Sequence, residues 1–397
     1  MVSSVSQDTQ SHTPGTIVLG VTDAVSLRLL TGFPEYLDDR GWRVHVVSNA
    51  QIGSNRGPVQ FHHIAMERAP RPLRDARALW RWYRLLRHVR PDVVSIGTPK
   101  AALLGLLAAQ FAGVSARVYK VRGLRLEGAR GAGRLLLWST EWITCGAAHA
   151  ALVVSPSLRN RLEGFRLAPP RKLRVLGSGS SNGVDLERFA TRRSASAHTQ
   201  PPADRDEVVI AFVGRMSRSK GVPELCNAFE ALQSSGIASK LLLVGDFEDE
   251  VSREAVSRLS RQGLPVDVVG FVDDVRELYG RVDVLCLPTH REGFPNVVLE
   301  AAAAAVPAVT TRATGAVDSV IDGVTGVLVP VGDTSALVRA LATLCADGTL
   351  RRRMGTAARQ RVAEEFDRRR LWQLEGDFYL EIQSASTRSN RRRSSRP

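Results

Sequence analysis

Short β-branched and aliphatic runs recur along the chain and alternate with longer segments in which apolar residues return every three or four positions. The short runs are typical of buried parallel strands, and the longer segments are typical of the helices that connect them. In the first half the runs are Thr16–Val21, Arg43–Ser48, Val93–Ile96, Arg117–Val121, Ala151–Val154 and Lys172–Leu176. In the second half they are Val208–Val213, Lys240–Val244, Pro265–Phe271, Val282–Leu287, Ala308–Thr311 and Val327–Val329. This α/β pattern predicts two Rossmann-like domains with parallel sheets that face each other across a cleft.

A segment rich in Ser, Ala, Pro and charge separates the two units. This segment, residues 191–206, is predicted to be an exposed linker. It divides an N-terminal domain at residues 16–190 from a C-terminal domain at residues 207–365. The 397 residues are enough for two domains with separate cores.

The two ends of the chain differ from the domains. Residues 366–385 carry an apolar stripe on roughly one helical face, so we expect this helix to pack against another part of the protein. The stripe consists of Leu371, Trp372, Phe378, Tyr379 and Ile382. Residues 1–15 are rich in Ser, Thr and Gln, and residues 386–397 contain five arginines among Ser, Asn and Pro. Both ends are too polar to bury a core and are predicted to be disordered.

The charge of the chain is concentrated in its first half. The sequence holds 54 Lys and Arg against 40 Asp and Glu, a formal charge of +14, which suits an acidic partner such as nucleic acid, an anionic membrane or a phosphorylated ligand. Residues 1–206 contain 29 basic and 15 acidic side chains, whereas residues 207–397 contain 25 of each. No recognised nucleic-acid module accompanies the arginines, so we do not expect nucleic acid to be the partner.

The segment Arg71–Arg90 is the most basic part of that first half. Its cationic face consists of Arg74, Arg77, Arg81, Arg84 and His88, and its apolar face of Leu79, Trp82, Leu85 and Leu86, with Trp80 and Tyr83 beside them. Such a helix could lie on an anionic bilayer and bring an enzyme to a lipid-linked acceptor. The alternative is an ordinary crossover helix whose basic face is solvated.

Cysteine spacing and the N-terminus indicate the compartment. Cys145, Cys226, Cys286 and Cys345 lie far apart, with no close pair to bind zinc or form a redox dithiol, so we expect reduced core residues. The N-terminus lacks the pattern of a signal peptide, and the best apolar stretch, residues 101–114, is too short to span a membrane. The sequence predicts a cytoplasmic protein, which the basic helix could hold at the inner face of the plasma membrane.

The first segment with candidate chemistry runs from Ala211 to Gly221. A strand ends at Val213, Gly214 frees the backbone to turn, and Arg215 and Lys220 follow five residues apart. Both cations can converge above the carboxyl end of the strand, where they would suit a diphosphate. A solvated basic turn would have the same spacing.

The second segment runs from Thr289 to Ala301 and crosses from a loop into a helix that we expect to continue to residue 305. Gly293 frees the loop, Pro295 suits a first helical turn, and the unpaired amides at the helix start form an anion site. Glu292 in the loop and Glu300 in the helix offer two carboxylates that can accept hydrogen bonds from sugar hydroxyls. The alternative is a helix N-terminal charge and a solvated helix residue.

Together with four further segments in the same order, these two resemble the family 4 retaining glycosyltransferases, which have the GT-B fold. The E-x7-E motif of that family is present as Glu292 to Glu300. The further segments are Asn182–Phe189, Leu241–Asp246, Gly270–Val275 and Asp322–Pro330. More weakly, Arg40–Ser48, Gly97–Gly105, Val121–Glu127 and Gly177–Asn182 resemble the branch that builds bacterial polysaccharides and glycolipids. The GT-B resemblance implies two Rossmann-like domains and a C-terminal helix that crosses back to the first.

The resemblance also assigns donor-side roles. Arg215 and Lys220 would hold the donor diphosphate and stabilise the leaving group in place of a metal, and Glu292 would contact the transferred sugar. The implied donor-binding residues are Gly214, Arg215, Lys220, Val272, Gly293, Phe294, Asn296 and Glu300. Glu300 would accept hydrogen bonds from the ribose hydroxyls, and Val272 would contact the base through its backbone. No cofactor is expected, because the nucleotide sugar is a substrate. No metal is expected either, because Arg215 and Lys220 would take its place.

Three residues of the N-terminal domain are candidates for the acceptor side. Asp23 lies in the first β–α loop, where the family's Gly-Gly is absent, and it could equally be a helix cap. Lys100 follows a later strand, and Arg122 stands where many relatives have a His that faces the donor sugar. Asp318 replaces a frequent Glu. These departures leave the donor sugar and the acceptor open.

The resemblance implies retaining transfer of a hexose-type sugar from a nucleotide diphosphate sugar, with UDP favoured, to a hydroxyl of a glycan or lipid-linked acceptor. No second carboxylate is clearly paired with Glu292, so we expect front-face transfer in which an oxygen of the leaving diphosphate helps to deprotonate the acceptor. The alternatives are a small-molecule acceptor and a non-transferase enzyme of the same fold, such as a nucleotide-sugar epimerase.

Overall fold

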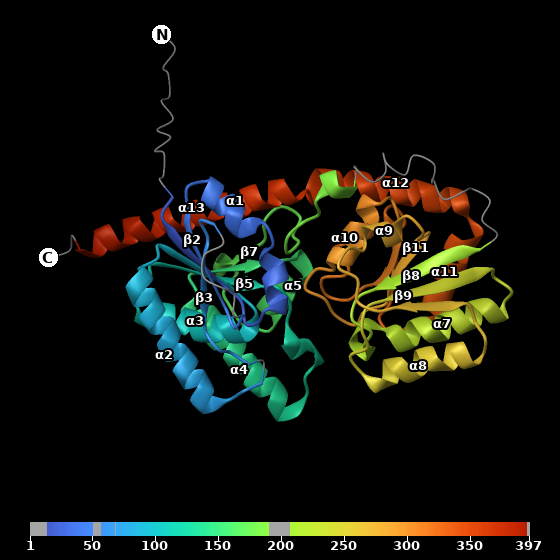
Figure 1. The fold of residues 1–397 in the computed structure, drawn as a ribbon, viewed down its shortest axis with the longest axis horizontal. Coiled ribbons are helices and arrows are strands. Elements are labelled where there is room, and N and C mark those ends of the chain that lie inside the picture. The colour runs from blue at the N-terminus through green and yellow to red at the C-terminus, as the bar shows by residue number, and fades with distance from the viewer. Residues whose placement is uncertain (1–13, 51–56, 68, 190–206, 395–397) are drawn as a thin grey trace, which may run out of the picture.

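Two α/β domains lie side by side in the computed structural model of the chain, and each consists of a parallel sheet with helices on both faces (Figure 1). The structure describes residues 14–50, 57–67, 69–189 and 207–394. The predicted linker at residues 191–206 lies outside these residues. So does the predicted N-terminal segment, apart from residues 14 and 15.

The N-terminal sheet has seven parallel strands in the order β3-β2-β1-β4-β5-β6-β7. These strands are β1 (Thr16–Gly20), β2 (Arg43–Ser48), β3 (Gln60–His63), β4 (Val93–Gly97), β5 (Ala116–Val121), β6 (Ala150–Val153) and β7 (Leu173–Arg174). The central strand β1 pairs with both β2 and β4, so Val18 lies opposite His45 on one side and Val94 on the other. Strand order therefore reverses between β1 and β4.

The C-terminal sheet has six parallel strands in the order β10-β9-β8-β11-β12-β13. These strands are β8 (Val208–Val213), β9 (Ser239–Val244), β10 (Val266–Val269), β11 (Val284–Leu287), β12 (Ala308–Thr311) and β13 (Gly326–Val329). The chain enters at the central strand β8, and the order reverses between β8 and β11. In open parallel sheets, ligands bind where the order reverses, at the carboxyl ends of the strands.

Helices fill the connections between these strands. In the N-terminal domain they are α1 (Phe33–Asp39), α2 (Pro72–Val89), α3 (Pro99–Phe111), α4 (Gly131–Ala147) and α5 (Pro156–Gly164), with 3₁₀ turns η1 (Val25–Leu30), η2 (Arg125–Gly128) and η3 (Pro170–Lys172). In the C-terminal domain they are η4 (Arg218–Lys220), α7 (Val222–Ser234), α8 (Glu250–Arg261), α9 (Arg276–Tyr279), α10 (Asn296–Ala303), α11 (Thr334–Ala346) and α12 (Gly348–Glu365). The last helix, α13 (Arg368–Ser394), continues from α12.

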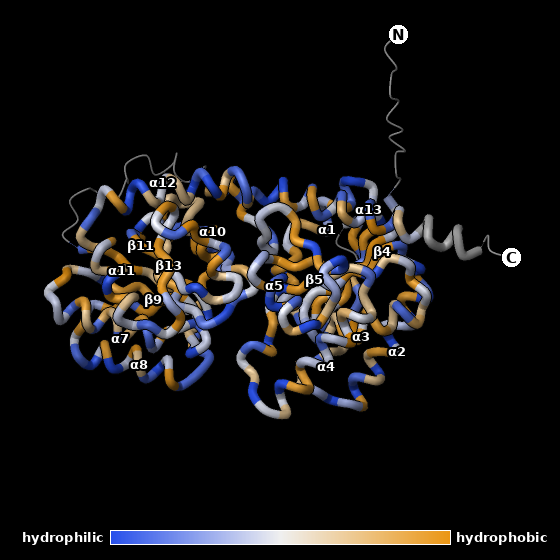
Figure 2. Tube along the Cα trace, turned by 180° about the vertical axis from the view of Figure 1, so that it is seen from behind, coloured by the Kyte–Doolittle hydropathy of each residue, from blue (hydrophilic) through white to orange (hydrophobic). Residues whose placement is uncertain are grey.

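Each sheet is buried on both faces, which is why its strands are almost continuously apolar (Figure 2). In the N-terminal domain one core lies under α2, α3, α4 and α5, and a second lies under α1 and α13. The C-terminal domain has its own core around β8, β9 and β11. The two-domain α/β architecture expected from the hydrophobic pattern is thus confirmed.

The observed elements differ from the sequence prediction in several places. Strand β3 was not predicted, because it is a short edge strand in which Phe61 is the one apolar residue and the other three are polar. The strand expected over Lys172–Leu176 reduces to the two residues of β7. Helix α10 ends at Ala303 and not at residue 305, since Ala305 takes a positive φ of 60° that a helix cannot continue.

The helix predicted over Arg71–Arg90 forms as α2, but its apolar face is not available to a membrane. Ala78, Trp82 and Leu86 are buried in the core beneath α2, and Leu79 and Leu85 pack against the same core. The arginines of its other face are exposed. Helix α2 is therefore a crossover helix packed on the core, and only its basic face is left for a membrane or another anionic partner.

Helix α13 leaves the C-terminal domain and crosses the N-terminal domain, where it contacts α1, β4 and β5 (Figure 1). Its predicted apolar stripe packs there, with Leu371, Phe378 and Tyr379 buried. The prediction of a disordered tail from residue 386 is wrong as far as Ser394, because the helix continues to that residue. Residues 386–394 contain neither Gly nor Pro, so a helix already formed by its packed part can extend through them.

Candidate active site

Two loops of the C-terminal domain meet where its strand order reverses. One follows β8 and contains η4, and the other follows β11 and leads into α10. Gly221 has a φ of 75° and lies so close to the second loop that a Cβ there would be 2.7 Å from the carbonyl carbon of Pro288. The backbone amide of His290 also donates to the carbonyl oxygen of Ser219 at 3.0 Å. These contacts fix the two loops against each other.

The joined loops bring two of the predicted catalytic residues into contact. The ammonium of Lys220 is ion-paired with the carboxylate of Glu292, and both side chains are largely buried, at 21% and 11% exposed. Burial strengthens such a pair relative to one in water. The structure therefore places a cation and a carboxylate side by side where the strand order reverses, a contact that the sequence did not predict.

Arg215 does not join this pair. Its guanidinium is 61% exposed and is ion-paired with Glu248, which follows β9. Gly214, just before it, has a φ of 146°, a conformation that favours glycine. The backbone at Gly214 therefore adopts the glycine conformation that the sequence predicted. The exposed ion pair of Arg215 with Glu248 is of a kind that contributes little to stability.

The domains approach each other so closely at Gly293 that only a glycine fits there. Its backbone conformation does not require a glycine, because its φ is not positive. A Cβ at this position would be 2.5 Å from the carbonyl carbon of Arg122 and nearer still to its oxygen. On the other side, Gly315 packs its backbone against Glu292 and Gly293, with a φ of 76°. The loop that carries Glu292 is therefore clamped between the N-terminal domain and the loop after β12.

The other residues around α10 take different positions. The ring of Phe294 is buried against Phe366, with ring centroids 5.3 Å apart, so only the backbone of Phe294 can face a ligand. Asn296 begins the helix, and its Oδ1 is buried with no hydrogen-bond partner among the described residues. A buried acceptor without a donor costs free energy unless a ligand supplies one.

Glu300 lies one turn further along α10 and is only partly accessible. Burial raises the pKa of its carboxyl to about 7, with a further rise from Asp274 and an opposing effect of Arg368. A carboxyl with this pKa is divided between its neutral and ionised forms at neutral pH. It can then donate or accept a hydrogen bond at the deeper end of the site.

Val272 lies half-buried beside Phe271, and a residue of the N-terminal domain reaches this segment. The guanidinium of Arg28, in η1, stacks over the ring of Phe271 at 4.6 Å and pairs with Asp273 at 3.2 Å. The region expected to meet the base therefore lies at the boundary between the domains.

The three predicted acceptor-side residues lie at carboxyl ends of the N-terminal strands, but each engages neighbours within its own domain. Asp23 accepts hydrogen bonds from the amide and hydroxyl of Ser26 at 2.9 and 2.8 Å, so its carboxylate supports the turn that leads into η1. Lys100 pairs with Asp75 at 2.8 Å. The guanidinium of Arg122 lies against Gly97 and donates to the carbonyl oxygen of Leu29 at 3.3 Å. Burial of this guanidinium lowers the pKa of Arg122.

Polar contacts between the domains were not predicted. Arg291 donates to the carbonyl oxygen of Arg125 at 3.0 Å, and Thr314 donates to the carboxylate of Glu127 at 2.7 Å. These partners are more than 160 residues apart, so no local signal in the sequence joins them. They hold η2 against the loop that carries Glu292.

A second interdomain contact joins Asp318 to the N-terminus of α5. Its carboxylate accepts hydrogen bonds from the amide of Ser157, at 3.0 Å, and from the hydroxyl of the same residue. The Ser157 hydroxyl in turn accepts from the amide of Gly315 at 2.7 Å. A negative charge at a helix N-terminus is favourable, so the shorter Asp318 carboxylate has a structural partner in this chain.

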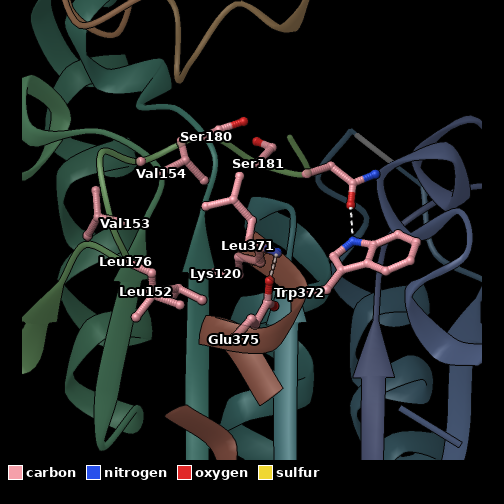
Figure 3. Close-up of a pocket in the computed structure, with 12 residues that line it drawn as sticks. Lys120, Leu152, Val153, Val154, Leu176, Ser180, Ser181, Leu371, Trp372 and Glu375 are labelled. Carbon is pink, nitrogen blue, oxygen red and sulfur yellow. Dashed lines mark hydrogen bonds and ion pairs between the residues drawn. The ribbon is translucent and has the colours of Figure 1, made fainter. Parts of the chain in front are cut away.

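Beneath α13 lies a small polar pocket that the sequence did not indicate (Figure 3). Lys120 of β5 pairs there with Glu375 of α13 at 2.6 Å, and their side chains are only 7% and 9% exposed. Tyr379 donates to Glu375 at 2.6 Å and contacts Ser95 at 2.7 Å. Burial lowers the pKa of Lys120 to about 8 against the opposing effect of Glu375. This network fastens α13 to the sheet.

The described residues hold neither a metal cluster nor a helix that could span a membrane. Within residues 14–50, 57–67, 69–189 and 207–394, no group of three or more His, Cys, Asp or Glu side chains is arranged to hold a metal ion. In the same part of the chain, none of the helices has the length and apolar character needed to cross a bilayer.

Each of the two domains matches a known protein-family model. A family model described as Glycosyltransferase Family 4 matches residues 30–188, and one described as Glycosyl transferases group 1 matches residues 207–347. The capsular polysaccharide biosynthesis glycosyltransferase CapM of Staphylococcus aureus is 35% identical over 355 residues, which are 89% of this chain and 93% of that protein.

Solved structures support the fold. Sucrose-phosphate synthase from Thermosynechococcus elongatus superposes with a TM-score of 0.77 at 19% identity, covering 94% of this chain and all of that one. HepE from Anabaena, solved in complex with UDP and glucose, gives a TM-score of 0.69 at 18% identity over 94% of this chain and 98% of that one. The two-domain fold expected from the sequence is confirmed.

Proposed function

This chain belongs to glycosyltransferase family 4, and on that premise we propose that it moves a hexose-type sugar from a nucleotide diphosphate sugar to a hydroxyl of a glycan or lipid-linked acceptor during synthesis of a bacterial cell-surface polysaccharide. The observation that carries the proposal is the Lys220–Glu292 pair at the strand-order reversal, beside the start of α10. The name of CapM supports the polysaccharide role, and the UDP and glucose bound to HepE support a UDP-sugar donor.

Lys220 has the position and charge to hold the donor diphosphate. A diphosphate at this point would compete with Glu292 for the ammonium and would also meet the amides at the start of α10. The negative charge that develops on the leaving group would then be stabilised by Lys220 and by Arg215, whose exposed pair with Glu248 is easily exchanged. No metal is needed for this stabilisation.

Glu292 would then be free to accept hydrogen bonds from the transferred sugar. The unpartnered Oδ1 of Asn296 offers a second acceptor for a sugar or ribose hydroxyl. Glu292 is paired with a lysine and not with a second carboxylate, which is not the arrangement of a double-displacement enzyme. We therefore favour front-face transfer with retention, in which a diphosphate oxygen takes the acceptor proton.

A ligand panel tests the donor class. UDP, GDP, ADP and a random oligonucleotide would be added separately, and the shift in the midpoint of thermal unfolding would be measured. We expect UDP to stabilise the protein most, because HepE binds UDP. A ligand present at about 100 times its Kd adds about 2.7 kcal/mol to the free energy of unfolding. A larger shift with the oligonucleotide would contradict a nucleotide-sugar enzyme.

Variants and product analysis test the chemistry. Lys220→Ala and Arg215→Ala should each lower the turnover of the preferred nucleotide sugar by about 100-fold. Lys240→Ala, which removes a lysine paired with Asp267 on the far part of the same sheet, is the matched control and should leave turnover unchanged. Unchanged turnover in Arg215→Ala would remove that residue from the mechanism, and conversion of the sugar nucleotide to an epimer would identify a non-transferase.

A further inference from the structure

Helix α4 exposes an apolar face that no other part of the described chain covers. Four large apolar side chains lie on it: Leu135 at 67%, Leu136 at 58%, Trp142 at 52% and Ile143 at 40% exposed. At 3.6 residues per turn, these positions fall within about a third of the circumference of the helix. Between Leu135 and Ala147 the only charged residue is Glu141, which is buried. So large an uncharged face on a surface helix indicates an interaction site.

Basic side chains flank this face. Arg130 and Arg134 are exposed at the start of α4, and α3 alone separates α4 from α2, since α3 packs on both helices. All three helices lie on the side of the N-terminal domain opposite α13 (Figure 1). Helix α2 presents five exposed arginines, Arg74, Arg77, Arg81, Arg84 and Arg87, together with the exposed ring of Trp80. An apolar helix face with arginines at its start, on the same side of the domain as a second helix that exposes arginines and a tryptophan, matches the interface of an anionic bilayer.

We propose that Leu135, Leu136, Trp142 and Ile143 of α4 insert into the interfacial region of an anionic lipid membrane while the arginines of α2 contact its headgroups. This assignment rests on the proposed function, which includes a lipid-linked acceptor, and it makes α4 the inserted helix and α2 its cationic flank. A second copy of the chain is disfavoured as the occupant, because it would carry the same exposed arginines around this face, whereas an anionic membrane has the complementary charge.

The α4 face is also connected to the active site. Helix α4 begins directly after η2, whose Glu127 accepts from Thr314 at 2.7 Å. The carbonyl oxygen of Thr314 accepts from the amide of Glu292 at 2.9 Å. A membrane bound at α4 would therefore lie beside the mouth of the cleft, where a lipid-linked acceptor has to enter.

Vesicle binding of the full chain tests the proposal. The protein would be sedimented with phosphatidylcholine vesicles that contain about 30% phosphatidylglycerol, a fraction that gives a strongly negative surface, and with phosphatidylcholine alone. The test variant carries Leu135→Ser, Leu136→Ser, Trp142→Ser and Ile143→Ser. We expect wild-type protein to bind the anionic vesicles. The affinity of the variant for the same vesicles should be lower by a factor of about ten or more.

A matched control removes equally exposed apolar residues from the C-terminal domain. Val251→Ser, Ile321→Ser and Val324→Ser change side chains that are 53%, 44% and 51% exposed, and this variant should bind like the wild type. Arg77→Ser combined with Arg81→Ser should weaken binding to anionic vesicles only. Undiminished binding by the α4 variant, or no wild-type binding at low salt, would overturn the proposal.

Two further measurements distinguish a membrane-binding face from a self-interface and from a misfolded variant. The α4 variant should keep the thermal stabilisation by UDP, which shows that it is folded and that donor binding is independent of the membrane face. If the wild type is a dimer in solution and the α4 variant a monomer with unaltered vesicle binding, the face is a self-interface and the membrane proposal is wrong. If vesicle binding holds but no nucleotide binds, the proposed function fails and the membrane face stands.

Discussion

Replacing Gly293 with alanine tests whether the active site depends on close contact between the domains. In the structure, the added Cβ would lie 2.5 Å from the carbonyl carbon of Arg122 and nearer to its oxygen. Ordinary carbon–carbon contacts are about 3.5 Å, so the two backbones must separate by about 1 Å. The opposing residue, Gly123, has no side chain that could move aside, and the clash is with backbone atoms that cannot rotate away.

This displacement acts directly on Glu292, which precedes Gly293 in the chain. An error of about 1 Å in the placement of reacting groups costs about 100-fold in rate. We therefore expect kcat for release of the nucleoside diphosphate to fall by about 100-fold, equivalent to about 2.7 kcal/mol of transition-state stabilisation. The added methyl group points to the domain boundary and not into a core, so the midpoint of thermal unfolding should change little.

Turnover of the preferred nucleotide sugar and small-angle scattering would be measured for Gly293→Ala and for a control, Gly164→Ala. Nothing lies within 4 Å of a Cβ at Gly164, which has no positive φ, so the control should keep wild-type turnover. A kcat of Gly293→Ala within about threefold of the wild type, with an unchanged scattering profile, would refute the reasoning.

Three acidic side chains give further predictions about stability. Glu375→Gln leaves Lys120 buried without its counter-charge, so the free energy of unfolding in urea should fall by about 3 kcal/mol or more. The double variant Lys120→Met/Glu375→Met removes both charges. A smaller loss of stability in this double variant would identify the uncompensated charge as the cause. Because the pKa of Glu300 is raised from 4.5 to about 7, ionisation opposes folding. Wild-type stability should therefore decline relative to Glu300→Gln as pH rises through that interval, and parallel pH profiles would contradict this. Asp318→Ala removes the acceptor for Ser157, so thermal unfolding should report a loss of about 1.5 kcal/mol or more, while an unchanged midpoint would show that the contact is not stabilising.

Much of the fold could be predicted because it depends on local pattern. Short, mostly apolar runs identified the central strands of both sheets, since strands buried on both faces are apolar over most of their length. The stripe on α13 was predicted from a different local pattern, apolar residues that recur on one face of a helix. Strand β3 escaped prediction because an edge strand with one polar side, Gln60–His63, has no such pattern. The helical residues 386–394 escaped because composition describes a segment in isolation and not as the continuation of a packed helix.

The candidate site was only partly predictable. The sequence indicated Lys220 and Glu292 separately, from a strand–turn pattern and a loop–helix pattern, and their positions after β8 and β11 follow from the parallel order of the strands. It indicated Gly293 for the wrong reason, as a residue that frees the loop. The Arg122 backbone that requires a glycine there belongs to the other domain, 171 residues earlier.

The sequence by itself determined which segments become buried strands and which loops carry charge, because these properties depend on residues that are neighbours in the chain. Only the tertiary structure decided that Lys220 meets Glu292, that Lys120 meets Glu375 and that Trp82 and Leu86 of α2 are buried whereas Leu135 and Leu136 of α4 are exposed. Those outcomes depend on which surfaces pack against each other over long separations, and packing is a property of the folded chain that no local pattern contains.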